Sequence, residues 1–80
     1  MNAAVRAQQL RLLRRCLATG ARVAVTYLGA DSLAHSRAGR VLAVQGSRFV
    51  LASLDPARLP RQATHDLANP EDVLAVEPVQ

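Results

Sequence analysis

The chain of 80 residues has no lysine, no tryptophan and one cysteine, and its only aromatic residues are Tyr27 and Phe49. The lone Cys16 excludes an intrachain disulfide, so we expect a reducing compartment, with the cytoplasm as the default. No apolar run reaches membrane-spanning length, so no membrane partner is expected. A core of valine, leucine and alanine with so few rings has little margin of stability. We therefore expect a homo-oligomer that buries further surface.

The sequence also lacks the residue groupings that catalysis and metal binding need. His35 and His65 have no second histidine or cysteine at ligand spacing, whereas zinc needs three or four convergent ligands. His65 and Asp66 are neighbours on an expected strand, so they point to opposite faces and cannot serve as a base and its orienting acid. The glycines are scattered and form no phosphate-cradling loop. We predict no catalytic residue, no metal site and no cofactor, and hence a protein that is not an enzyme.

Acidic residues are almost absent from the first part of the chain. Residues 1–48 hold eight arginines and a single acid, Asp31, whereas residues 49–80 hold two arginines and five acids. The first segment therefore carries a charge of +7 and the second −3, for a net charge of +4. Guanidinium groups form planar, bidentate contacts with phosphate and carboxylate, so this asymmetry favours an anionic partner. The alternative is a compositional bias in which arginine only keeps the surface soluble.

An amphipathic helix is predicted over residues 3–18. Asn2 would cap its start, and Gly20 stands where a left-handed residue commonly ends a helix. At about 100° per residue the apolar side chains fall on one face and three arginines on the other. The apolar face consists of Val5, Leu10, Leu12, Leu13, Cys16 and Leu17, and the basic face of Arg11, Arg14 and Arg15.

Beyond Gly20 the apolar period changes from 3.6 residues to about two, which predicts strands. In the first strand Val23, Val25 and Tyr27 share one face. Gly39 indicates a bend or bulge in the second strand, and a tight turn at residues 45–47 joins it to the third. The predicted strands cover residues 22–28, 37–45, 48–53, 62–67 and 73–77.

Two features of the C-terminal part complete the predicted element order. Asn69-Pro70-Glu71-Asp72 has the pattern of a one-turn helix, with an asparagine cap and proline at the first helical position. The strand that follows is expected to stop before Pro78. Five short strands cannot cover two sheet faces, so we predict a closed small barrel with the helix over one open end. The chain is then a single domain over residues 1–80, with the barrel at about 21–78.

This element order resembles the SH3-like and Sm-like small barrels, in which an N-terminal helix precedes five bent strands. In the SH3-like group a one-turn helix comes before the last strand. The resemblance implies a mainly β fold class. Within it, the strand of residues 20–27 that ends in tyrosine and the Arg48-Phe49-Val50-Leu51 strand resemble a WYL domain, a regulatory module that senses nucleic acids or nucleotides. Leu51 is the residue identical to the Trp-Tyr-Leu strand of that family, Phe49 keeps its aromatic character, and residues 69–73 hold acids where the family has an arginine motif.

Backbone-directed binding of DNA or RNA is the first functional hypothesis. Arg37, Arg40 and Arg48 fall on adjacent strands of one hairpin, and Arg40 and Arg48 are expected to be near cross-strand neighbours. The basic helix face offers a second surface. Because Tyr27 and Phe49 are expected in the core, no exposed ring is expected to stack on bases.

The alternative hypothesis is a protein-interaction or self-assembly adaptor. Its basic helix and hairpin would meet an acidic protein surface, such as residues 66–77 of a neighbouring copy. Contacts of this kind are steered by charge and screened by salt.

Overall fold

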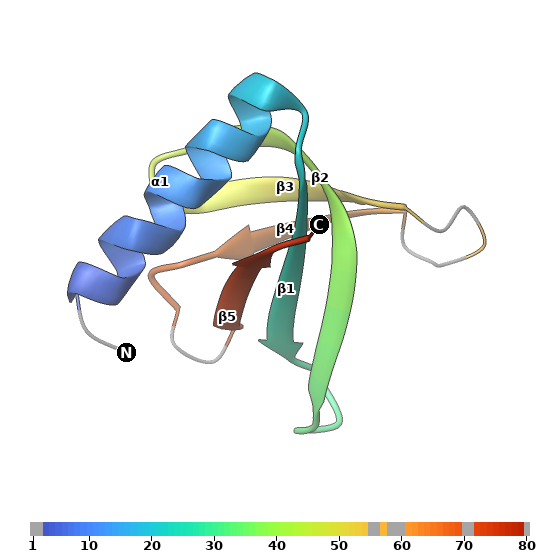
Figure 1. The fold of residues 1–80 in the computed structure, drawn as a ribbon. Coiled ribbons are helices and arrows are strands. Elements are labelled where there is room, and N and C mark those ends of the chain that lie inside the picture. Colours follow the sequence, from blue (N-terminus) through green and yellow to red (C-terminus); the bar gives the residue numbers. More distant parts are fainter. Residues whose placement is uncertain (1–2, 55–56, 58–60, 70–71, 80) are drawn as a thin grey trace.

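The computed structural model describes residues 3–54, 57, 61–69 and 72–79, which form one helix and five strands (Figure 1). The predicted mainly β class with an N-terminal helix is confirmed. Each predicted strand is present, and the second begins three residues earlier than expected. The elements are α1 (Ala3–Thr19), β1 (Arg22–Leu28), β2 (Ala34–Gln45), β3 (Arg48–Ser53), β4 (Gln62–Asp66) and β5 (Val73–Pro78).

The helix ends as the sequence predicts. Gly20 has a φ of 74° and its N–H donates to the Cys16 carbonyl over 2.8 Å, which satisfies an orphan carbonyl of the last turn. The proposed cap, Asn2, lies outside the described residues. The helix α1 packs chiefly against β2, and its buried side chains form a single line, narrower than predicted, with Leu10 and Leu12 half-buried against the core. That line consists of Gln9, Leu13 and Cys16, while Val5 and Leu17 stay exposed.

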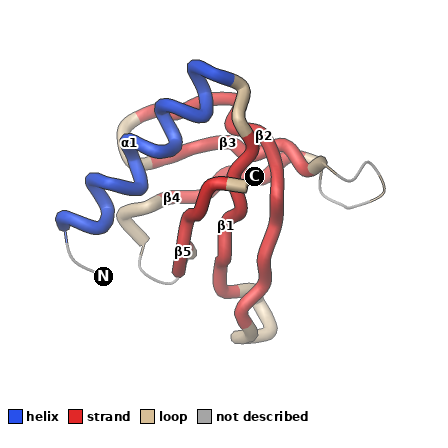
Figure 2. The backbone as a smooth tube through the Cα atoms, viewed as in Figure 1, coloured by secondary structure: helices blue, strands red, loops and turns tan. Residues whose placement is uncertain are grey.

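The strands form one antiparallel sheet in the order β4-β3-β2-β1-β5. Four strands follow one another as a meander, and β5 returns to lie beside β1 (Figure 2). The sheet curls but is not closed, since β4 and β5 are not paired in the part of the chain that the structure describes. One physical reason is local: the Asp66 N–H at the end of β4 donates to the Asp72 carboxylate over 2.8 Å instead of to another strand.

Gly39 has a different role from the predicted bend or bulge. It is paired regularly with Val23 and Ser53, and a Cβ there would collide with the Ala52 carbonyl oxygen. Glycine therefore allows β3 to approach β2 closely. The register shifts of the sheet fall elsewhere, at Leu42 in β2 and between β1 and β5 at Thr26–Tyr27.

The predicted hairpin turn is confirmed. Gln45 and Arg48 are partners, so the connection has two residues, and Gly46 takes a φ of 62°. β5 continues one residue further than predicted, through Pro78, which an edge strand tolerates because one side of it needs no N–H donor. The predicted one-turn helix includes Pro70 and Glu71, which lie outside the described residues.

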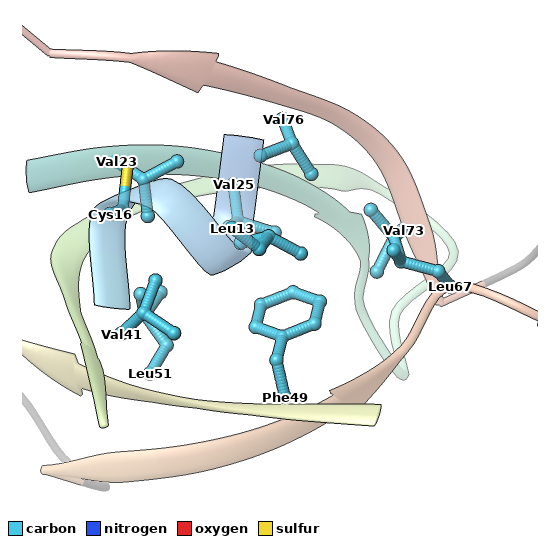
Figure 3. Close-up of a cluster of buried hydrophobic side chains, with 10 residues drawn as sticks. All are labelled: Leu13, Cys16, Val23, Val25, Val41, Phe49, Leu51, Leu67, Val73 and Val76. Atoms are coloured by element: carbon cyan, nitrogen blue, oxygen red, sulfur yellow. The ribbon is translucent and has the colours of Figure 1, made fainter. Parts of the chain in front are cut away.

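The core fills the inside of the curl. Figure 3 shows side chains from α1, β1, β2, β3 and β5, together with Leu67 just beyond β4, pointing toward one another, with Phe49 at the centre beside Leu13. Leu13, Val23, Val25, Leu51 and Val73 are fully buried and Phe49 is 1% exposed. Burying a leucine of this kind stabilises the fold by about 1.5–3 kcal/mol.

Candidate anion-binding surface

Two of the predicted contact residues lie on opposite faces of β2. Strand alternation turns Arg37 toward the inside of the curl, where it is only 4% exposed, and turns Arg40 outward into solvent. Arg37 is thus not on the surface where the sequence hypothesis placed it. The signal that was overlooked is simple parity: Arg37 shares its face with Gly39 and Val41, which are buried.

The prediction that Arg40 and Arg48 are near cross-strand neighbours is wrong. Arg40 stands opposite Ala52, while Arg48 stands opposite Gln45, next to the turn. Ala52 and Arg48 are four positions apart on β3, or roughly 13 Å at about 3.3 Å per residue. The two arginines therefore share the outer face of the sheet, but at a distance of two alternate side chains.

Arg22 is the true cross-strand neighbour of Arg40, and the sequence hypothesis missed it. The two residues are direct partners in the β1–β2 register, and both are exposed. Neither has an ion pair with a carboxylate among the described residues. Like charges directly opposite each other destabilise a sheet. The register therefore brings two exposed guanidinium groups together on the outer face.

Arg48 is partly neutralised. Its Nε lies 3.7 Å from an Asp66 carboxylate oxygen, while its side chain remains 74% exposed. The Ser47 hydroxyl donates to Asp66 over 2.6 Å. The pKa of Asp66 is lowered from its usual range, first by this hydroxyl, then by the Ala68 N–H and the charge of Arg48. The ionised aspartate thus lies beside Arg48 at the end of the sheet, while most of the Arg48 side chain remains in solvent.

We call the outward row of arginines on β1, β2 and β3 the outer basic face: Arg22, Arg40 and Arg48. The predicted helix arginines form a separate surface. Their side chains are exposed on the side of α1 away from Leu13, and no ion pair joins them to the described carboxylates. These three are Arg11, Arg14 and Arg15.

The inside of the curl holds a polar cluster that the sequence did not reveal. The Arg37 guanidinium carbon lies 5.9 Å from the centre of the Tyr27 ring, and its Nε and Nη1 are buried without a hydrogen-bond partner. On either side of Tyr27 are His35 and His65, with ring centres 5.7 and 5.2 Å away. Phe49 continues the row of rings, 5.5 Å from His65.

Each histidine of this cluster is bonded to an aspartate. His65 Nδ1 lies 2.9 Å from an Asp72 oxygen, so its acidic partner comes from beyond the strand and is not the adjacent Asp66. His35 Nε2 lies 2.9 Å from Asp31. The hydrogen bond to His35 is the main cause that lowers the pKa of Asp31, helped by the Leu33 N–H. Three of the described carboxylates are therefore engaged within the molecule.

The prediction that both aromatic rings lie in the core is confirmed for Phe49 and holds only in part for Tyr27. Phe49 is buried, and Tyr27 is half-buried between the two imidazoles. Within the described ranges, no group of three or more histidine, cysteine, aspartate or glutamate side chains is arranged to hold a metal ion. No helix in those ranges has the length and apolar character needed to cross a bilayer.

The chain matches no protein-family model, no curated protein and no solved structure.

Proposed function

We propose that the protein is a small, non-enzymatic regulatory module that binds the phosphate backbone of DNA or RNA through the outer basic face. We propose further that its curled sheet belongs to the SH3-like or Sm-like small barrels. The antiparallel meander, with β5 returning beside β1, supports that class. The resemblance to WYL domains points to the same class of ligand.

The direct pairing of Arg22 with Arg40 carries the proposal. Two exposed guanidinium groups side by side repel each other when the protein is free, and an anion between them removes that repulsion. Phosphate accepts the bidentate contacts that arginine offers. Arg48 adds a third guanidinium on the same face, roughly 13 Å along β3, a distance that spans about two nucleotides of an extended strand.

The position of the rings supports contact with the backbone over sequence-specific stacking. Single-strand binders of barrel type commonly stack bases on exposed aromatic side chains. Here the two aromatic residues face inward. The helix arginines act at longer range, where they steer the polyanion toward the protein at low salt.

Two of the four acids in residues 66–77, the acidic surface that the self-assembly alternative needs, are already engaged within the chain, while Glu77 is exposed. Asp66 is bonded to Ser47 and paired with Arg48, and Asp72 is bonded to His65 and to the Asp66 N–H. Docking of these carboxylates on the arginines of a second copy would break contacts that each chain already makes. The geometry therefore favours an external polyanion.

The experiment is a binding titration with a labelled single-stranded oligonucleotide at about 50 and 200 mM salt, with the protein mass followed by light scattering. We expect retention at low salt, a marked loss at high salt and an unchanged protein mass. A salt-sensitive oligomer that ignores DNA and RNA would instead establish the adaptor function.

A charge-reversed variant locates the contact. Arg22→Glu with Arg40→Glu should lower affinity by about a hundredfold, because two phosphate contacts are replaced by repulsion. The variant keeps two like charges opposite each other, so its melting temperature should stay near that of the parent. Arg11→Glu with Arg14→Glu is the matched control, since it changes the net charge equally on the helix. An equal loss in the control would mean that only net charge matters, and would refute the assigned surface.

A further inference from the structure

A hollow lies beside Arg48 on the outer side of the sheet. Its volume is about 260 Å³. On the register, Ala43 and Val50 are partners on β2 and β3, and Thr64 is the next partner on β4. Gln45 and Arg48 form the following row. The hollow is lined by Ala43, Gln45, Arg48, Phe49, Val50 and Thr64.

The hollow owes its shape to the bulge at Leu42. The extra residue shifts β2 by one position, so that Leu42 and Ala43 are both exposed although they are consecutive. Bulges bend a strand locally and are common beside binding sites. The small side chains of Ala43 and Ala52 leave space above the sheet surface, whereas the neighbouring Leu42 projects into solvent with 46% of its surface exposed.

We infer that this hollow receives one base of a single-stranded nucleic acid; the inference depends on the proposed function. Ala43 and Val50 offer an apolar floor for the flat face of a base. Gln45 and Thr64 supply amide and hydroxyl groups that donate to and accept from a base edge. The hollow has the volume for a single base and its sugar, whereas a paired base in a duplex is not free to enter it.

Charge complementarity identifies the occupant. Arg40 is opposite Ala52, two positions along β3 from Val50, and Arg48 is two positions from Val50 in the other direction. A base seated over Val50 therefore has a guanidinium on each side of it, at a spacing that suits phosphates about two nucleotides apart on the same strand. An uncharged apolar ligand would leave both guanidinium groups unused.

The test compares a labelled single strand of about twelve nucleotides with a strand of the same length in which every base is removed. Both strands carry the same phosphates. The intact strand should bind about tenfold more tightly, the size expected for one base contact. Ala43→Leu, which fills the hollow, should reduce that ratio to below about twofold and leave the affinity for the abasic strand unchanged.

Ala24→Leu is the matched control, because it makes the same enlargement on the outer face of β1, away from the hollow. It should keep the ratio of the parent protein. Thr64→Val, which removes only the hydroxyl, should lower the ratio by about threefold. Competition by unlabelled RNA and DNA then identifies which nucleic acid fills the hollow.

Two results separate this inference from the function on which it rests. Equal, salt-dependent binding of the intact and abasic strands would overturn the base site while leaving backbone binding intact. No binding of either strand at low salt would overturn both. A ratio that persists in Ala43→Leu would place the base elsewhere on the protein and refute the assigned hollow.

Discussion

Arg37 and Arg40 lie three residues apart on one strand, yet they belong to different environments. Arg37 is buried against Tyr27 with two guanidinium nitrogens unpartnered, whereas Arg40 is exposed beside Arg22. The inner face of the sheet thus carries a charge that acts on stability, and the outer face carries charges that are free to act on a ligand. An arginine-rich stretch therefore has no single function, because strand alternation places its side chains on two different faces of the sheet.

The largest expected effect is a loss of stability on truncating a side chain of α1 that packs against the inner face of the sheet. Leu13 is fully buried in the core, so Leu13→Ala should lower the free energy of unfolding by about 2–5 kcal/mol. A domain of this size has only about 5–15 kcal/mol in total, so the melting temperature should fall steeply. Leu17→Ala is the control, because Leu17 lies on the same helix but is 40% exposed. Similar losses in both variants would show that α1 does not dock along the described line.

Gly39→Ala should give the second-largest loss in the free energy of unfolding. A methyl group there meets the Ala52 backbone, which cannot move without separating β3 from β2, so a loss of about 1–3 kcal/mol is expected in chemical denaturation. Gly46→Ala is the comparison. It has open space around it but a positive φ, so its cost of about 1 kcal/mol is purely conformational. An unchanged free energy of unfolding in Gly39→Ala would contradict the close approach of β3 to β2 at this residue.

Arg37→Met should raise the free energy of unfolding by about 1 kcal/mol, because it removes a buried charge that has no carboxylate partner among the described residues. Loss of the contact with Tyr27 offsets part of the gain. Arg40→Met should change stability by less than about 0.5 kcal/mol, since its site is exposed. Thermal unfolding of the two variants measures this difference in stability between the inner and the outer face. A lower melting temperature in Arg37→Met than in the parent protein would contradict the prediction.

The smallest effect concerns Asp66. Its pKa in the folded protein is depressed below 3.8, so the stability that it contributes is complete above pH 3.8 and is lost as the pH falls through the folded value. Ser47→Ala removes the main cause and should move the pKa of Asp66 up toward 3.8 in a carboxyl NMR titration. Ser36→Ala, on the outer face of β2, should leave it where it is. An unmoved pKa in Ser47→Ala would disprove the role of the hydroxyl.

Much of the fold follows from local patterns in the sequence. Gly20 and the apolar spacing of Leu13 and Cys16 predict the helix, and alternation predicts β3 to the residue. The features of the fold that depend on contacts between distant parts of the chain could not be predicted. The open edge at β4 follows from a bond between Asp66 and Asp72, and the bulge at Leu42 has no glycine or proline to announce it.

In the candidate site, too, features that depend on local sequence were predicted and features that depend on distant contacts were not. Five of the six predicted contact arginines are exposed, as Arg40 and Arg14 illustrate, and only Arg37 is buried. Arg22 was missed because its importance arises only from pairing with Arg40, which requires the β1–β2 register. Arg37 was misassigned because an arginine on an inward position is rare, and charge alone suggested a surface.

The salt dependence of binding tests most directly whether Arg22 and Arg40 bind phosphate together. For a single strand, the slope of log Kobs against log salt falls by about 0.7 for each phosphate contact. Arg22→Gln with Arg40→Gln should therefore make the slope shallower by about 1.4 relative to the parent protein. A slope equal to that of the parent protein would contradict the claim.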